Sequence, residues 1–338
     1  MSVPSRLPIV QAPMAGGPST PELAAAVAGA GGFGYVAGGY LTAETLRQAL
    51  DRTRALTSDP IGVNLFVPGD RAADPDAIER YAERLRPLAN RFGAQLGEAR
   101  WEDDAYAAKL DVLESAGVHT VSFTFGCPAP PDVQRLHRAG AQVAVTVTGR
   151  AEAEQAVAAG ADTLIVQGTE AGGHQGTFDG ALADAGPNRV PLRDALAETA
   201  GLDRPMIAAG GIATADDVRA VLDAGASAVQ VGTALLCTPE AGTSAPYRAA
   251  LLEHRYAETV LTRAFSGRWA RGLANWFARE HSDAPAGYPE VHHLTRPLRA
   301  AATKAGDPDV PNLWAGTGWA TVTAEPVGEV IRRLASGL

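Results

Sequence analysis

The chain has 338 residues, 46% of them hydrophobic, and a formal net charge of -9. The length suits a barrel enzyme with an extension, and the acidic balance argues against nucleic acid or an anionic membrane as a partner. No apolar stretch approaches the length of a membrane span, and the N-terminus lacks a signal-peptide pattern. We therefore expect a cytoplasmic protein that acts on a small molecule. No Cys and His residues stand at metal-ligand spacing, so no metal site is expected.

A repeated unit organises the first two thirds of the chain. Ala-Gly dipeptides end helix-like segments and precede runs of β-branched residues, a pattern typical of an αβ repeat. Continuous apolar runs predict strands of a parallel sheet at 8–12, 33–37, 61–66, 119–123, 142–147, 163–166, 205–209 and 226–231. Interleaved with helices, these eight strands predict an α/β protein with a (β/α)8 TIM barrel.

Two departures from the repeat define the domains. Residues 70–118 are too many for one helix after the third strand, so an inserted helical segment with helices at 76–91 and 103–116 is expected. We assign residues 1–258 to the barrel. Residues 259–338, where the repeat stops, form a C-terminal extension that should cover the barrel mouth.

The most informative segment is the glycine-rich loop at 167–176, directly after the sixth predicted strand. Chemistry in such barrels gathers in the loops that follow the strands, and His174 is an imidazole set among glycines there. His174 is therefore the candidate catalytic residue. Glu170 either orients the imidazole or has a structural role, which we favour. His119 lies at a strand start, and His292 and His293 in the extension are expected on the surface.

Other strand ends carry residues suited to a ligand. Asn64, near the end of the third strand, can donate to and accept from a heterocycle. Glycines after the seventh and eighth strands, at 210–211 and 230–233, are typical of a phosphate site built from backbone N–H groups. Flavin mononucleotide (FMN) and sugar phosphates would both satisfy this pattern.

Taken together, the segments 11–23, 62–66, 122–126, 167–176, 209–212 and 230–233 resemble nitronate monooxygenases, which are FMN-dependent barrel enzymes. Segments 265–268 and 313–316 in the extension are also similar. The resemblance implies that His174 faces the substrate. It also implies a set of FMN-binding residues, namely Ala12, Pro13, Met14, Asn64, Gln167, Gly172, Gly173, Gly210, Gly211, Gln230, Val231, Gly232 and Thr233.

By this resemblance the chain oxidises alkyl nitronates, with propionate 3-nitronate the expected substrate, using O2 and no nicotinamide cofactor. The products would be a carbonyl compound and nitrite. Thr124 stands where some members have histidine and is a candidate for the substrate wall. Lys304, in the extension, could hold an anionic substrate, although a solvated position is favoured. A monomer or a homodimer is expected.

Three alternatives stay open. A flavin-dependent enoyl-acyl-carrier-protein reductase would share the loop at 170–174 and the barrel but take hydride from a nicotinamide. A flavin-binding protein without turnover is the second. The third is a metal-free barrel that binds a sugar phosphate.

Overall fold

The computed structural model describes residues 4–69, 73–178 and 186–338, and its centre is a closed parallel barrel. Eight strands pair in the order β1-β9-β8-β6-β5-β4-β3-β2, and a bridge between Val10 and Phe33 joins β1 to β2. The strands are β1 (Ile9–Gln11), β2 (Gly34–Ala37), β3 (Ile61–Phe66), β4 (Thr120–Thr124), β5 (Gln142–Val147), β6 (Thr163–Gln167), β8 (Met206–Ala209) and β9 (Ala228–Val231). Every predicted strand is present, so the (β/α)8 barrel is confirmed.

Alternate strand residues enter two buried layers. One set fills the barrel and includes Phe33, Tyr35 and Ile165. The residues between them, such as Val36 and Val145, pack against the surrounding helices. Because neither face meets water, the strands read as continuous apolar runs.

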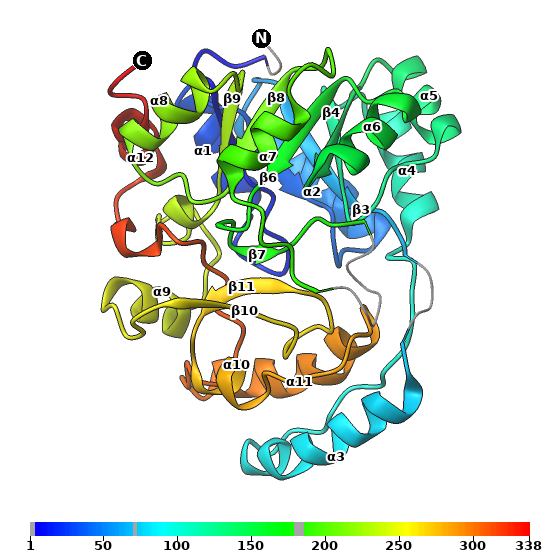
Figure 1. Cartoon of the computed structure of the whole chain (residues 1–338), viewed down its shortest axis with the longest axis vertical. Coiled ribbons are helices and arrows are strands. Elements are labelled where there is room, and N and C mark those ends of the chain that lie inside the picture. The colour runs from blue at the N-terminus through cyan, green and yellow to red at the C-terminus, as the bar shows by residue number, and fades with distance from the viewer. Residues whose placement is uncertain (1–3, 70–72, 179–185) are drawn as a thin grey trace.

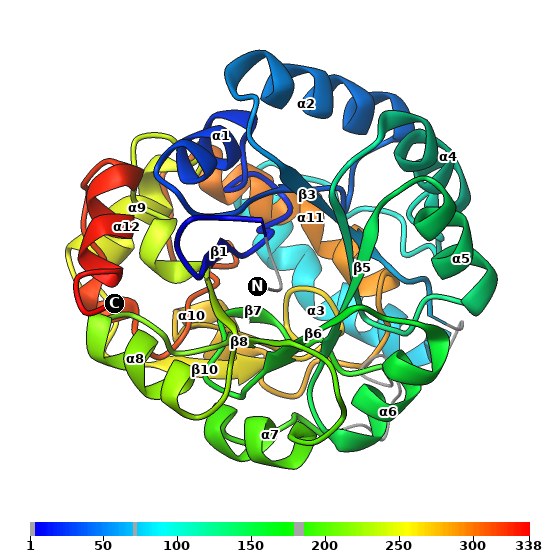
Figure 2. The same ribbon diagram turned by 90° about the horizontal axis from the view of Figure 1, so that it is seen from above.

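The helices form a ring around the barrel (Figure 2). The expected N-terminal signals are present: Thr20 caps α1 (Pro21–Gly29), and Thr214 forms a capping box at the start of α8 (Ala215–Asp223). Further helices of the ring are α2 (Ala43–Leu56), α4 (Tyr106–Ala116), α5 (Pro130–Arg138), α6 (Arg150–Ala159) and α7 (Leu192–Thr199). No helix in the described ranges is long and apolar enough to cross a membrane.

The end of the chain completes this ring. Helix α12 (Val327–Leu334) lies between α8 and α1 (Figure 2) and buries Val327, Val330 and Ile331 in the barrel core. The last helix of the extension therefore belongs to the ring around the barrel. After β9, the short turn η1 (Thr233–Leu235) leads to α9 (Ala245–Leu252), which packs near η2 (Trp319–Thr321).

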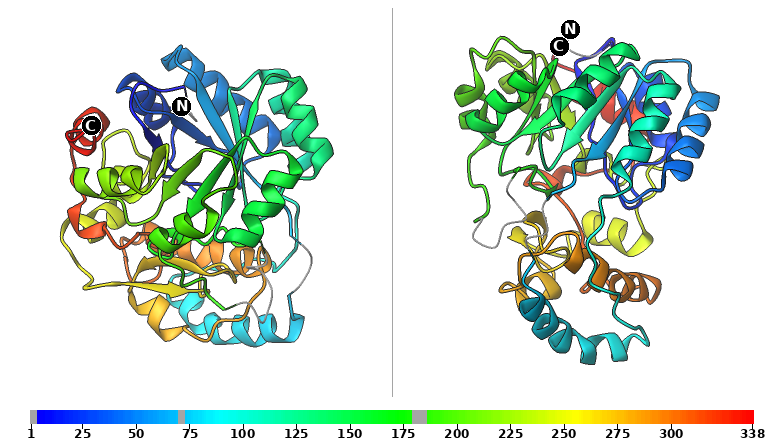
Figure 3. Two further views of the ribbon diagram at one scale, coloured as in Figure 1. Left: turned by 45° about the horizontal axis from the view of Figure 1, so that its top comes forward. Right: turned by 90° about the vertical axis from the view of Figure 1, so that its right-hand side faces the viewer.

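An accessory module lies at the carboxyl ends of the barrel strands (Figures 1 and 3). It contains a three-stranded antiparallel sheet of β10 (Thr259–Thr262), β11 (Ala270–Leu273) and β7 (Gly173–His174), and the helices α3 (Pro75–Arg91), α10 (Trp276–Glu280) and α11 (Glu290–Lys304). Its own apolar core joins Tyr81 and Leu85 of α3 to Phe265, Phe277 and Leu294.

The helices expected within 70–118 are present as α3 and α4, and residues 70–72 lie outside the described ranges. The two helices belong to different layers. Helix α4 packs against α2 and α5 in the barrel ring, whereas α3 packs against α11 in the accessory module. One helix of the insertion, α3, therefore builds the accessory layer together with α11 of the extension.

Candidate active site

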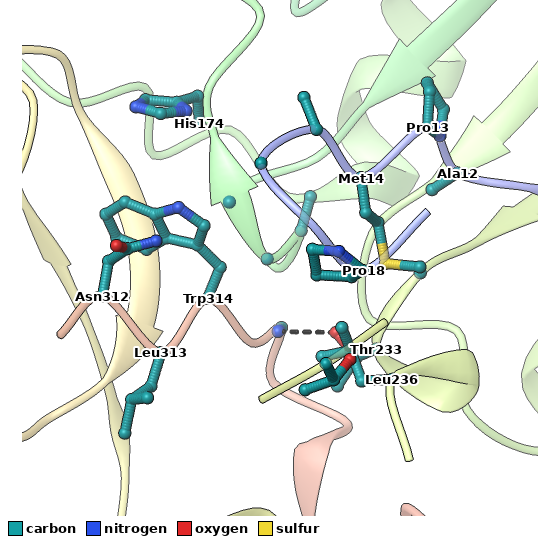
Figure 4. Close-up of a pocket in the computed structure, with 18 of the residues that line it drawn as sticks. Ala12, Pro13, Met14, Pro18, His174, Thr233, Leu236, Asn312, Leu313 and Trp314 are labelled. Atoms are coloured by element: carbon teal, nitrogen blue, oxygen red, sulfur yellow. Dashed lines mark hydrogen bonds between the residues drawn. The ribbon is translucent and has the colours of Figure 1, made fainter. Parts of the chain in front are cut away.

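A cavity of about 460 Å³ lies where the barrel strands end and the accessory module begins. This volume is typical of a small-molecule site. Figure 4 shows Met14 and Pro13 on one side of it and His174 and Trp314 on the other. The cavity is lined by the predicted residues Ala12, Pro13, Met14, Asn64, Thr124, Gln167, Gly172, Gly173, His174, Gly210, Gly211, Gln230, Val231, Gly232 and Thr233.

One end of the cavity is built from bare backbone. Gly211 follows β8 with a φ of 72°, and a Cβ there would lie 2.9 Å from the Cβ of Glu170. Gly232 follows β9, and the hydroxyl of Thr233 accepts a hydrogen bond of 2.9 Å from the Gly316 N–H (dashed line in Figure 4). The N–H groups of Gly211, Gly232 and Thr233 make no hydrogen bond to any described residue. Unpaired N–H groups at such turns suit an anionic oxygen.

The side-chain amides of Asn64 and Gln230, on the barrel side of the cavity, differ in their hydrogen bonding. Asn64 is buried and its amide donates to the hydroxyls of Ser122 and Thr124, each at 3.0 Å, so its orientation is fixed. Gln230 lines the cavity, and its buried Oε1 accepts no hydrogen bond from a described residue. Because buried polar atoms are rarely left unpaired, Gln230 marks a place for a ligand donor.

Gln167 and Glu170 hold the glycine-rich loop in place. The Gln167 amide donates to the His174 carbonyl at 3.1 Å, and its oxygen accepts from the Gly176 N–H at 2.7 Å. The Glu170 carboxylate accepts from the Leu192 N–H at 3.0 Å. These contacts agree with the structural role favoured for Glu170. They also use both ends of the Gln167 amide within the loop.

His174 lies in β7, which pairs with β11 of the accessory module. Its Nε2 is hydrogen-bonded to the Ser266 hydroxyl at 2.7 Å, across 92 positions of sequence. The same hydroxyl lies 3.3 Å from the Arg268 carbonyl, to which it can donate. The extension thus supplies the partner that orients the imidazole.

Aromatic rings surround the His174 imidazole. The centroids of Trp314, Phe125 and Tyr288 lie 5.3, 5.6 and 5.7 Å from its own. Burial, together with the positive charge of Arg268 and a second arginine, lowers the pKa of His174 to about 3. The imidazole is therefore neutral at physiological pH and can donate through one nitrogen while accepting at the other.

Residues of α11 and of the loop after β2 form a further part of the cavity wall. His292 is buried and stacks on Tyr40 with centroids 4.3 Å apart. The expectation that His292 and His293 lie on the surface is wrong, because both are buried and His292 lines the cavity. Arg299, about two turns further along α11 than His292, also lines the cavity.

Lys304 is the one predicted site residue that the structure places elsewhere. It is exposed at the last position of α11 and does not line the cavity, whereas its neighbour Thr303 does. A helix turns about 100° per residue, so adjacent positions face different directions.

No group of three or more His, Cys, Asp or Glu in the described ranges could hold a metal ion.

Several cavity residues were not singled out from the sequence. Ser266 and Trp314 fall in two extension segments that resemble the family, and these segments were the available signal. Tyr40 and Arg299 had none, because the loop after β2 and the buried face of α11 reach the site only through tertiary packing.

Comparison with known proteins gives a consistent result. The model of the nitronate monooxygenase family matches residues 4–337. The chain is 40% identical to a nitronate monooxygenase from Pseudomonas aeruginosa, with 98% of this chain and 96% of that protein covered. It is 37% identical to one from Paraburkholderia phytofirmans, with 97% and 91% covered.

Among solved structures, a nitroalkane oxidase from Streptomyces ansochromogenes matches with a TM-score of 0.93 and 48% identity, covering 98% of this chain and 95% of that one. FabK from Thermotoga maritima matches with a TM-score of 0.75 and 26% identity, covering 99% and 93%. Because the family match and these relatives span the barrel and the accessory module alike, the chain belongs to the nitronate monooxygenase family and is an oxidoreductase.

Proposed function

We propose that the chain is an FMN-dependent nitronate monooxygenase that uses O2 to oxidise a nitronate carrying a second anionic group, such as propionate 3-nitronate, to a carbonyl compound and nitrite. The observation that supports this most directly is the position of His174. A neutral imidazole lines one cavity together with unpaired backbone N–H groups that suit a phosphate and an unpartnered amide oxygen, Gln230 Oε1, that suits a heterocycle.

The residues present fit FMN. The unpaired N–H groups of Gly211, Gly232 and Thr233 suit the phosphate, and a Cβ at Gly211 would meet Glu170 at 2.9 Å, so no side chain can replace the glycine without displacement. The unpartnered Gln230 Oε1 suits a ring N–H, and the oriented Asn64 amide suits a ring heteroatom. When bound, FMN would supply the redox chemistry, taking an electron from the nitronate and allowing reaction with O2.

His174 would hold the reacting group. If the Ser266 hydroxyl donates to the Arg268 carbonyl, it accepts from the Nε2–H, and Nδ1 keeps a lone pair that could abstract the α-proton of a neutral nitroalkane. If the hydroxyl instead donates to Nε2, Nδ1 carries the proton and can donate to a nitronate oxygen. Both tautomers are neutral, as the low pKa of His174 requires.

Arg299 supports the choice of an anionic substrate. Its guanidinium contacts Thr295 Oγ1 at 3.0 Å, the His292 carbonyl at 3.2 Å and the Asn312 side chain, none of which carries a negative charge. No described acidic side chain forms an ion pair with it. Burial lowers the pKa of Arg299 to about 10, which still leaves it cationic at neutral pH. The exposed Arg296 lines the same cavity, so this end attracts a carboxylate.

The test begins with the colour of the purified protein and the identity of its released flavin. Anaerobic mixing with propionate 3-nitronate should bleach the flavin, and aerobic mixing should consume O2 and release nitrite. A flavin-binding protein without turnover would keep its colour under nitronate. Rapid bleaching by NADPH together with turnover of an enoyl thioester would instead favour a reductase, and a colourless protein that cannot be reconstituted would favour a sugar-phosphate barrel.

A further inference from the structure

A buried ion pair at the start of helix α4 joins Lys109 of the helix to Asp104, which lies just before it, and the proposed chemistry does not use it. Lys109 is one of two lysines in the chain, and its side chain is 1% exposed. Its Nζ lies 2.7 Å from Oδ2 of Asp104, which is 16% exposed. Burial raises the pKa of Asp104 and lowers that of Lys109, and in each case the opposite charge of the partner counteracts the shift. Apolar residues could fill this space at a lower desolvation cost, so stability alone does not explain why a buried ion pair is present.

The second carboxylate oxygen of Asp104 leads to the cavity. Oδ1 accepts a hydrogen bond of 2.9 Å from the backbone N–H of Tyr40, in the loop after β2. Tyr40 has a φ of 64° and Asp104 a φ of 54°, the left-handed region that non-glycine residues seldom occupy. Such backbone persists only where the surroundings impose it. At Tyr40 the Asp104 carboxylate contributes to this, together with the hydrogen bond from the Leu41 N–H to the Gly38 carbonyl that closes the turn.

The Tyr40 side chain stands at the centre of the cavity wall. Its ring stacks on His292 at an interplanar angle of 2°, and its hydroxyl lies 3.1 Å from the Tyr288 hydroxyl. The Tyr288 ring in turn lies 5.7 Å from His174. A continuous series of contacts therefore runs from Lys109 through Asp104, Tyr40 and Tyr288 to the imidazole.

A second, smaller cavity of about 30 Å³ shows why packing alone does not hold Tyr40. This small cavity is lined by Tyr40 and Asp104, and it shares Tyr40, Phe66 and Phe125 with the large one. Tyr40 thus lines both cavities, and the atoms that face them lack packing partners there. The contacts that fix it are the backbone hydrogen bond to Asp104, the stack with His292, the hydroxyl contact with Tyr288 and the edge contact with Phe66.

We propose that Asp104, held by Lys109, is a positioning residue that acts through Tyr40 to fix the aromatic wall against which the nitronate lies beside His174. The inference rests on the proposed function, and it assigns a role to a pair of which neither member lines the large cavity. Lys109 does not line either cavity. Neither residue is expected to contact the reacting atoms.

Two double variants isolate the contact. Both Asp104→Asn/Lys109→Met and Asp104→Ala/Lys109→Met remove the buried charges, but only the first keeps an acceptor for the Tyr40 N–H. We expect kcat/KM for propionate 3-nitronate to fall at least tenfold further in the alanine variant than in the asparagine variant, with flavin content equal in the two. The Tyr40 amide should also exchange with solvent faster in the alanine variant.

The same comparison in a Tyr40→Ala background separates positioning from general destabilisation. If Asp104 acts through the Tyr40 side chain, the difference between the two double variants disappears there. Leu113→Ala is the matched control, because Leu113 is buried in the same helix and belongs only to the apolar core. It should lower the thermal midpoint and leave kcat/KM unchanged.

Equal kcat/KM in the two double variants, or a difference that persists without the Tyr40 side chain, would overturn the inference. Failure of both double variants to fold would also overturn it, because the pair would then be structural. In these cases wild-type turnover of the nitronate remains, so the proposed function stands. A wild-type protein without nitronate turnover would overturn both.

Discussion

Replacing His174 by alanine removes an imidazole that lines the cavity together with the backbone cradle and the aromatic rings. The cradle itself is formed by Gly211, Gly232 and Thr233 and does not depend on that side chain. The variant should therefore bind FMN normally. What it loses is the polar contact to the reacting group, together with the contact of Nε2 to Ser266 at 2.7 Å.

The size of the loss follows from the kind of contact. Removing one preorganised donor to a developing charge typically lowers the rate by about 10²–10³-fold, or roughly 2.7–4 kcal/mol. Aromatic rings surround His174, and a preorganised donor in such a low-dielectric site is worth more than one in water. We expect kcat/KM for the nitronate to fall by about 10²-fold or more. His174→Gln, which keeps an N–H donor, should lose less.

Anaerobic stopped-flow measurement of flavin bleaching tests this directly, with flavin absorbance per chain as the measure of cofactor content. The pH profile gives an independent check. Because the pKa of His174 is about 3, its protonation should not affect kcat/KM between about pH 5 and 8. Unchanged turnover in His174→Ala, or a wild-type inflection near pH 6.5 that this variant abolishes, would refute the reasoning.

Three further outcomes are expected. Gly211→Val should lose FMN, because the new Cβ would meet Glu170. Gly117, with a φ of 62°, has open space around it, so Gly117→Val should keep FMN despite similar backbone strain. Flavin absorbance per chain compares the two variants. In steady-state assays, Arg299→Met should raise the KM for propionate 3-nitronate about tenfold or more and leave the KM for ethylnitronate nearly unchanged. Equal changes in the two KM values would contradict an anionic subsite. Burial lowers the pKa of His281 to about 4, so the unfolded chain, with a value near 6.5, binds the proton first. Stability should therefore fall by roughly 1.4 kcal/mol per pH unit as the pH drops from about 6.5 to 4, and His281→Phe should reduce this slope in thermal melts; an unchanged slope would argue against the buried neutral form.

The sequence alone was sufficient for the barrel. Each strand is a run of apolar residues buried on both faces, and helix starts such as Thr20 and Thr214 are signalled by the residues that cap them. These are short-range effects, so they can be recognised in a window of a few residues. The glycines after β8 and β9 and the loop carrying His174 were found for the same reason.

Only the tertiary structure decided what faces that loop. Ser266 reaches His174 because β11 pairs with β7, and Arg299 reaches the cavity because α11 presents that face to the barrel. Lys304 and His292 show the limit: helical periodicity indicates that one face is buried, but the layer that covers it is set by packing between distant segments. The pairing of α3 with α11 and the return of α12 to the ring depend on the same long-range contacts, which no local sequence preference encodes.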